Sequence, residues 1–309
     1  MAIVVIRQDN KLDAWKKALI AKASNTAIYS YLEDHPKEEI TMACIWKQPS
    51  ETLNLYPNLK CIASFGAGVD FIFKDHSVPK HIPITRVVDP VLASDMSEFV
   101  LALILGFFKN LTTYRTDQLQ KIWSPQDYKR ISDVTVGIMG MGALGEKLAE
   151  DLIKNRFRVV GWAKSKKLIP GVEVYTGNSQ KNTFLSLSNI LVCLLPLTKE
   201  TTGILNSKLF RELPKQSYVI NVARGGHLVD EDLLEYVNNG HLAGAGLDVF
   251  HEEPLPVEHP FWDHPKIQIT PHVASVSDID SVIPQLLENY RRLEEGLPLM
   301  NEVSREKEY

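Results

Sequence analysis

The sequence contains few cysteines and no long apolar run. Its three cysteines, Cys44, Cys61 and Cys193, do not have the spacing of metal ligands, and their odd number does not form a complete set of disulfides. We therefore expect buried, reduced thiols and a cytoplasmic protein. The longest apolar run, over residues 99–108, reaches about half the length of a membrane-spanning helix. The sequence therefore predicts no membrane segment.

The sequence also lacks an excess of positive charge. It has 34 lysines and arginines against 38 acidic residues, and its formal net charge is −4. Proteins that bind nucleic acids carry a basic patch or stripe, so this balance argues against a nucleic-acid partner and favours a small molecule. The length of 309 residues is sufficient for two domains, each with its own core.

Apolar segments of strand length alternate with helical segments along the whole chain. This alternation indicates parallel sheets that are covered by helices on both faces. We predict an α/β fold with two Rossmann-like or flavodoxin-like doubly wound parallel-sheet domains and an interdomain cleft. The expected strands are residues 2–6, 41–46, 59–64, 84–88, 134–139, 158–162, 190–195, 218–222, 243–249 and 268–270.

The expected domains are discontinuous in sequence. Residues 1–97 and 277–309 are predicted to form a substrate domain, and residues 98–276 a dinucleotide-binding domain. A long helix over 94–112, with Ser94 or Asp95 as its N-cap after a break at Asp89-Pro90, is expected to bridge them.

The best-defined motif is VTVGIMGMGALG over residues 134–145. It is a buried strand that leads into GxGxxG at the start of a helix, the pattern of a dinucleotide-binding turn. Gly140 allows the tight turn, Gly142 lets the backbone approach a pyrophosphate, and Gly145 lets the helix pack on the strand. The alternative, a tight turn without a ligand, is common in α/β proteins.

The end of the next strand favours NADP(H) over NAD(H). An NAD-binding chain has an acidic residue about twenty positions after the glycines, which binds the ribose 2′-hydroxyl. Here that region reads Lys164-Ser165-Lys166-Lys167. Lysine charges and a hydroxyl donor suit a 2′-phosphate, and a carboxylate would repel it. The alternative is an exposed turn with solvated lysines, and NAD(H) remains possible.

Three residues that follow predicted strands are candidates for catalytic roles. Arg224 in NVARGG can bind a carboxylate or polarise a carbonyl. Glu253 in HEEPLP can stabilise the protonated imidazole of His272 in TPHVAS, which is then suited to act as a general acid. Glu252 is an alternative to Glu253 for this role. The chemistry requires no metal.

These motifs, in this order, resemble the D-isomer-specific 2-hydroxyacid dehydrogenase family. The motifs are GMGALG, LLPLT with TTG, NVARGG, GLDVFHEEPLP and TPHVAS, and FGAGVD at 65–70 extends the likeness to the first half. Within the family, the chain is similar to the glyoxylate/hydroxypyruvate reductase A type. That likeness is carried by IWKQP at 45–49, RVVDP at 86–90, Met96, Trp162 and the short C-terminal segment.

The resemblance implies a role for each matching position. Arg224 would orient a 2-oxo acid, His272 would be the acid/base and Glu253, which precedes Pro254, would pair with it. Asp248 would lie near the nicotinamide carboxamide. Further cofactor contacts are expected from Ala143, Leu144, Leu195, Pro196, Thr201, Val222, Ala223 and Ala274, and substrate contacts from Trp46, Ala67, Gly68 and Arg86.

The implied activity is reduction of a small 2-oxo acid such as glyoxylate or hydroxypyruvate to a D-2-hydroxy acid by an NADP-preferring homodimer. Two alternatives remain open at this point. One is a nucleotide-sensing corepressor-like binding protein on the same fold, and the other is a dehydrogenase for a bulkier 2-oxo acid. A formate- or phosphite-type dehydrogenase fits less well, because of the basic segment 164–167 and of the Trp46 loop in place of a longer N-terminal elaboration. A phosphoglycerate-type enzyme fits less well, because it is expected to carry a regulatory C-terminal domain.

Overall fold

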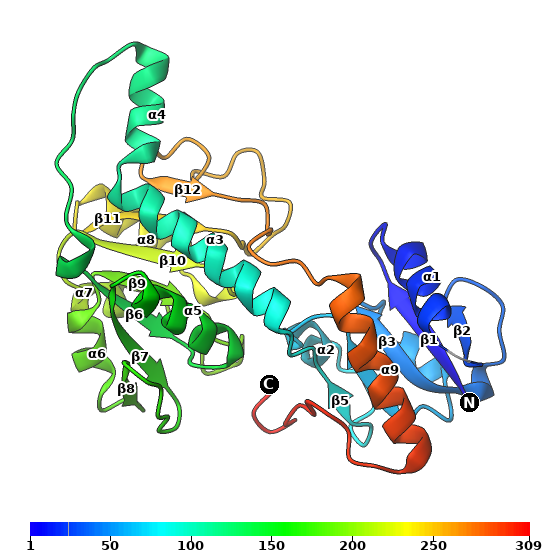
Figure 1. Cartoon of the computed structure of the whole chain (residues 1–309). Coiled ribbons are helices and arrows are strands. Elements are labelled where there is room, and N and C mark those ends of the chain that lie inside the picture. The colour runs from blue at the N-terminus through cyan, green and yellow to red at the C-terminus, as the bar shows by residue number, and fades with distance from the viewer. Residues whose placement is uncertain (24) are drawn as a thin grey trace. The chain divides into compact units, whose positions relative to one another are not determined.

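The computed structural model describes residues 1–23 and 25–309, which form two compact α/β units (Figure 1). Unit 1 comprises Met1–Leu92 and Ser277–Tyr309, and unit 2 comprises Ala93–Val276. The first division therefore falls after Leu92, where we had expected it after residue 97. Met96 explains the difference, because its side chain is buried in the core of unit 2.

Unit 1 contains a five-stranded parallel sheet with the order β2-β1-β3-β4-β5. This is the strand order of flavodoxin-like folds. Helices α1 and α9 cover one face, where their apolar side chains share a core with β1 and β3, and α2 contributes to the other face. The elements are β1 (Ala2–Arg7), α1 (Leu12–Lys22), β2 (Ala27–Ser30), η1 (Lys37–Glu39), β3 (Ile40–Trp46), η2 (Thr52–Leu55), β4 (Cys61–Ser64), α2 (Asp70–Lys74), β5 (Ile84–Thr85) and α9 (Ile279–Glu295).

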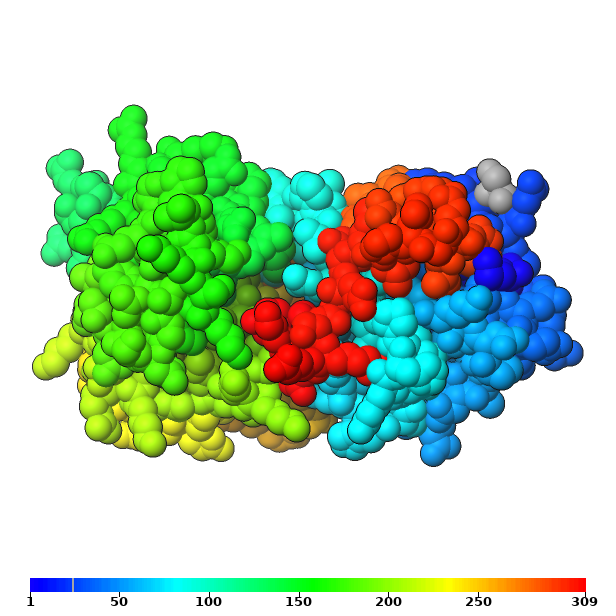
Figure 2. Space-filling model, turned by 90° about the horizontal axis from the view of Figure 1, so that it is seen from below, coloured from blue at the N-terminus to red at the C-terminus, as the bar shows by residue number. Residues whose placement is uncertain are grey.

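The C-terminal tail extends the β5 edge of this sheet. The amide of Val303 donates to the carbonyl of Ile84 over 2.8 Å, and the amide of Arg86 donates to the carbonyl of Asn301 over 3.1 Å. Figure 2 shows the tail (red) at the surface beside the cyan segment that contains β5. The tail therefore pairs with a strand edge that would otherwise present unpaired backbone groups.

Unit 2 contains a seven-stranded parallel sheet with the order β12-β11-β10-β9-β6-β7-β8. Helices α3 and α5 cover one face, and α6, α7 and α8 cover the other. The elements are α3 (Pro90–Phe108), α4 (Leu111–Gln120), η3 (Ile131–Asp133), β6 (Thr135–Met139), α5 (Ala143–Lys154), β7 (Arg158–Ala163), β8 (Glu173–Thr176), α6 (Lys181–Leu187), β9 (Ile190–Cys193), α7 (Ser207–Glu212), β10 (Ser217–Asn221), η4 (Gly225–His227), α8 (Asp230–Asn238), β11 (Leu242–Leu247) and β12 (Ile267–Ile269).

The expected helix over 94–112 is two helices, and the first begins earlier than predicted. Pro90 is the first residue of α3, and the Asp89 carboxylate accepts a hydrogen bond from the amide of Val91 over 3.0 Å. Asp89-Pro90 is therefore an N-cap followed by proline at the first helical position, where a proline is well tolerated. The first helix ends at Phe108, and Asn110, with φ of 53°, separates it from α4.

Helix α3 is, among the described residues, the one helix that is long and apolar enough to cross a membrane, with 19 residues and a mean hydropathy of 1.8. The sequence-based statement that no stretch approaches this length was wrong, because it considered only the uninterrupted run 99–108. In unit 2, Val100, Leu103 and Ile104 of α3 are buried against the sheet. This side of the helix is part of the hydrophobic core.

Candidate active site

The glycine turn over residues 140–145 leaves an open space at the start of α5. Gly140 has φ of 103°, a conformation that favours glycine, and a Cβ on Gly145 would lie 2.0 Å from the carbonyl oxygen of Gly140. A Cβ on Gly142, in contrast, would meet no atom within 4 Å. The turn therefore needs two glycines for its own packing, and the third leaves room for a ligand at the helix N-terminus. This geometry fits a pyrophosphate.

The loops after β9 and β10 lie at the same sheet edge as the glycine turn. Strands β6 and β9 are neighbours although they are not consecutive, so the strand order changes direction between them. Ligands of open α/β sheets bind at the carboxyl ends of the strands beside such a point. The loop after β9 contains Leu195, Pro196 and Thr201, and the Thr201 hydroxyl donates to the Pro196 carbonyl over 2.7 Å. Val222 and Ala223, both buried, follow β10.

Two of the lysines after β7, Lys164 and Lys167, are paired with glutamates from other segments. Lys164 donates to Glu200 over 3.0 Å, and Lys167 is paired with Glu146. Ser165 and Lys166 lie between them and are exposed. The sequence contains no acidic residue at the end of this strand, but the fold brings two to its lysines. Exposed ion pairs contribute little free energy, so an anionic ligand can compete with these glutamates.

The structure brings His272 and Glu253 into direct contact. His272 Nδ1 lies 2.8 Å from Glu253 Oε2, and the other carboxylate oxygen accepts a hydrogen bond from the amide of Phe250 over 3.1 Å. The partner of His272 is thus Glu253 and not Glu252. Because Nδ1 faces the carboxylate, Nε2 is the nitrogen that can transfer a proton to a substrate. His272 has φ of 53°, which is uncommon for a residue other than glycine.

Asp248 holds the turn on which His272 lies. Its side chain is fully buried, and Oδ1 accepts hydrogen bonds from the Thr270 hydroxyl at 2.6 Å and from the Val273 amide at 2.9 Å. Oδ2 accepts from the Ala274 amide at 2.9 Å. A buried carboxylate needs such donors, because it has lost its hydration. This contact with the turn was not predicted from the sequence, which assigned Asp248 only to the nicotinamide.

Arg224 follows β10 on a loop that lies against the loop of Glu253. Its carbonyl accepts a hydrogen bond from the Asn221 side chain over 2.9 Å, and its guanidinium donates to the Ala223 carbonyl over 2.6 Å. A Cβ on Gly225 would lie 2.0 Å from the carbonyl carbon of Phe250. Only glycine permits this approach of two loops from neighbouring strands, so Arg224 and Glu253 belong to one packed edge of the sheet.

The predicted substrate residues of unit 1 lie at the carboxyl ends of β3, β4 and β5. The Trp46 ring covers Gly66, where a Cβ would lie 2.5 Å from a ring carbon. Ala67 and Gly68 follow as partly buried residues. Burial lowers the pKa of the Arg86 guanidinium, although Tyr309 opposes this shift.

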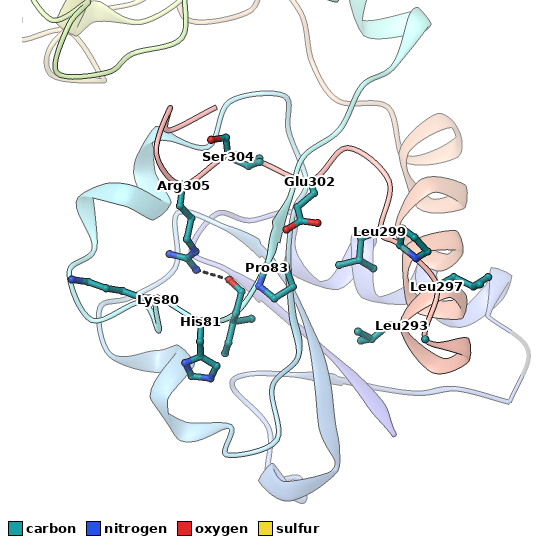
Figure 3. A pocket seen from close by; sticks show the side chains of 13 residues that line it. Lys80, His81, Pro83, Leu293, Leu297, Leu299, Glu302, Ser304 and Arg305 are labelled. Atoms are coloured by element: carbon teal, nitrogen blue, oxygen red, sulfur yellow. Dashed lines mark hydrogen bonds between the residues drawn. The ribbon is translucent and has the colours of Figure 1, made fainter.

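A separate hollow of about 680 Å³ lies in unit 1 between the segment before β5 and the C-terminal tail (Figure 3). Arg305 donates from one side to the carbonyls of Pro79 and Ile82. Lys80 and Glu302 give the lining charges of both signs. The hollow is at the amino end of β5, away from the carboxyl ends of the strands, so we do not assign it to the active site. Within residues 1–23 and 25–309, no group of three or more His, Cys, Asp or Glu side chains is arranged to hold a metal ion.

Comparison with known proteins identifies the family. The model of the D-isomer specific 2-hydroxyacid dehydrogenase NAD binding domain matches residues 101–274. The glyoxylate/hydroxypyruvate reductase A of Klebsiella pneumoniae (strain 342) is 41% identical over 272 residues, which are 86% of this chain and 87% of that protein. The reductase A of Enterobacter sp. (strain 638) is 36% identical over 301 residues, or 96% of each chain.

A solved structure gives the same result. The D-isomer specific 2-hydroxyacid dehydrogenase of Xanthobacter autotrophicus Py2, in complex with NADPH and MES, aligns with a TM-score of 0.95 and 34% identity over 100% of this chain and 99% of that one. The chain belongs to the D-isomer specific 2-hydroxyacid dehydrogenase family and is an oxidoreductase of that class. The predicted pair of parallel-sheet α/β domains and the resemblance to the glyoxylate/hydroxypyruvate reductase A type are both confirmed.

The glycine turn supplies a testable prediction. Gly142→Ala should keep the wild-type melting temperature, because its Cβ meets no protein atom, but should weaken NADPH binding by about tenfold or more, roughly 1.4 kcal/mol. Gly145→Ala should instead lower stability by about 1–3 kcal/mol through its clash with Gly140. Gly106→Ala on α3, also without neighbours, is the control. Thermal melting and NADPH titration separate the cases, and unchanged NADPH affinity in Gly142→Ala would contradict the assignment.

Proposed function

We propose that this enzyme is an NADPH-preferring reductase of small 2-oxo acids, such as glyoxylate or hydroxypyruvate, that forms D-2-hydroxy acids. The observation that carries the proposal is the 2.8 Å contact between His272 and Glu253 on loops beside that of Arg224. The names of its relatives support the substrate class. A panel of 2-oxo acids of increasing side-chain size, assayed with NADPH and with NADH at the nicotinamide absorbance, tests the proposal and separates it from a dehydrogenase for bulkier acids.

Each residue of the proposed site has its own role in carbonyl reduction. Arg224 binds the substrate through its planar guanidinium and polarises the 2-oxo group, while the amides of Ala67 and Gly68 bind the carboxylate. A bound nicotinamide nucleotide supplies the hydride. As negative charge develops on the carbonyl oxygen, His272 donates its Nε2 proton to that oxygen, and Glu253 stabilises the protonated imidazole before the transfer. Trp46 and Arg86 are proposed to contact the rest of the substrate.

The preference for NADP(H) rests on the basic segment 164–167. A 2′-phosphate carries about −1.5 to −2 charges at neutral pH, by analogy with other phosphate monoesters, and can take lysine partners from exposed glutamates. The Xanthobacter autotrophicus structure contains NADPH, and the NADPH-dependent glyoxylate/hydroxypyruvate reductase of Sinorhizobium meliloti, 35% identical with a TM-score of 0.93, contains NADP. The three cysteines are buried free thiols, which agrees with the cytoplasmic location we propose.

Removal of the imidazole should abolish most of the turnover. We expect His272→Ala to lower kcat by about 10²–10⁴-fold, the usual contribution of a general acid, while NADPH binding stays within about twofold of wild type. His76→Ala, an exposed histidine of unit 1, is the matched control and should leave kcat unchanged. Steady-state kinetics and NADPH titration make the measurement. A fully active His272→Ala enzyme would exclude this histidine as the acid.

The cofactor preference should depend on Lys164 and Ser165. The double variant Lys164→Ala/Ser165→Ala should raise the KM for NADPH by about tenfold or more, through loss of one charged and one neutral partner, and leave the KM for NADH nearly unchanged. Lys215→Ala serves as the control, because this exposed lysine precedes β10 at the opposite end of the strands. If the ratio of the two KM values does not change in the double variant, the phosphate is not bound here.

We propose that the protein forms a homodimer through the segment 111–128. The segment contains large apolar side chains that are exposed, including Leu119 at 71% and Trp123 at 95%. Figure 1 shows α4 and the chain that follows it standing away from the sheet of unit 2. Several large apolar side chains exposed within one short segment are typical of an interface, and a second copy supplies an identical partner surface. The other large apolar side chains exposed here are Leu111, Tyr114, Ile122 and Tyr128.

Charged substitutions in this segment should separate the subunits. Leu119→Asp/Trp123→Asp should convert a dimer into a monomer in sedimentation velocity, because it places carboxylates in an apolar contact. Leu168→Asp, at a 91% exposed position between β7 and β8, should remain dimeric. A monomeric wild-type protein, or a double variant that stays dimeric, would show that the segment is not the interface.

A further inference from the structure

His227 is a fully buried imidazole that lies between two backbone carbonyls. It ends the short turn η4, which directly follows Arg224. Its Nδ1 lies 3.1 Å from the carbonyl oxygen of Arg224, and its Nε2 lies 3.3 Å from the carbonyl oxygen of Pro196. The ring is fully buried, so its polar environment consists of these two carbonyls and the Cys193 thiol.

The two carbonyl contacts favour the protonated state of the ring. A neutral imidazole has one N–H donor and one lone pair, so one of its nitrogens would set a lone pair against a carbonyl oxygen. A protonated imidazole donates from both nitrogens and satisfies both contacts. Burial opposes the charge, but Cys193 and the two carbonyls outweigh it and raise the pKa of His227. The titratable or charged residues next to the ring are Cys193, at the end of β9, and Arg224.

The two carbonyls belong to the two loops that the proposed function uses. Arg224 follows β10 and is proposed to bind the 2-oxo acid. Pro196 follows the neighbouring strand β9 and is proposed to contact the cofactor. The imidazole therefore joins the substrate loop to the cofactor loop across adjacent strands.

We propose that His227 is a positioning residue that, as a double hydrogen-bond donor, fixes Arg224 for the substrate through one nitrogen and the Pro196 loop for the cofactor through the other. This inference rests on the proposed function of both loops. Because His227 is fully buried, it acts through the two backbone segments. Each nitrogen should accordingly control a different kinetic constant.

Two conservative variants separate the nitrogens. In asparagine the amide nitrogen is two bonds from Cβ, as Nδ1 is in histidine, and in glutamine it is three bonds from Cβ, as Nε2 is. His227→Asn can therefore keep the donor to Arg224, and His227→Gln the donor to Pro196. His227→Leu keeps neither. The carbonyls of Arg224 and Pro196 retain donors from Asn221 and Thr201, so the variants leave no orphaned carbonyl and should fold.

The Asn and Gln variants are expected to change different constants. A lost hydrogen bond is worth about 2- to 10-fold. His227→Asn should raise the Kd for NADPH by this factor, measured by fluorescence titration, and leave the KM for glyoxylate near wild type. His227→Gln should do the reverse, and His227→Leu should change both constants. Melting temperatures are recorded for all three, and His76→Ala is again the control.

Several outcomes would overturn the proposal. Asn and Gln variants that match each other in both constants would exclude separate roles for the nitrogens. A lower melting temperature with unchanged constants would assign His227 to stability alone. If His227→Leu does not fold, the Asn and Gln variants still carry the comparison. A wild-type enzyme that reduces no 2-oxo acid would instead defeat the proposed function, and the NADPH titrations would still report on the Pro196 contact.

Discussion

The carboxylate of Asp248 joins the end of β11 to the turn after β12, and the position of His272 depends on this contact. A fully buried carboxylate without donors would be strongly unfavourable. The three donors from Thr270, Val273 and Ala274 remove that penalty only if the turn adopts its observed path. That path places His272 at a positive φ, which costs on the order of 1 kcal/mol or more and is stable because the surrounding hydrogen bonds determine it.

Close backbone packing then brings the other parts of the site to the same edge. The missing side chain of Gly225 lets the Arg224 loop lie against Phe250, whose amide in turn donates to Glu253. These contacts follow from the parallel sheet, because the carboxyl ends of β10, β11 and β12 are neighbours. The sheet supplies the proximity, and a few small or polar residues convert it into a defined geometry for Arg224, Glu253 and His272.

Part of this arrangement could be predicted from the sequence, because it depends on local pattern. Apolar runs predict the buried central strands of both sheets, and the GxGxxG spacing predicts the glycine turn. The edge strands β2 and β8 were missed, since their side chains are only partly buried and show no apolar run. The start of α3 was missed because Asp89-Pro90 can end a strand or begin a helix, and tertiary packing decides between the two.

Other contacts of the site could not be predicted, because they join residues that are distant in sequence and no motif marks them. Glu200 lies 36 positions from Lys164, and the Asp248 side chain reaches a turn more than 20 residues away. The lysines and serine after β7 predict a phosphate site from local sequence alone. The glutamates that pair with these lysines, Glu146 and Glu200, come from two other segments, so the local sequence could not predict them. The pair of Glu253 and His272, in contrast, could be proposed from the sequence because each residue lies next to a proline in a short motif.

Asp248 and His227 show why both an anion and a ring donor are buried at this edge. Loops that leave parallel strands carry backbone groups that no ladder satisfies. In the turn after β12 these are amides, and a carboxylate is the side chain that accepts from several of them. In the loops after β9 and β10 they are carbonyls, and a protonated imidazole can donate to two at once. Each side chain has the hydrogen-bonding type that its backbone partners require. Together they connect the loops of four neighbouring strands, β9 to β12.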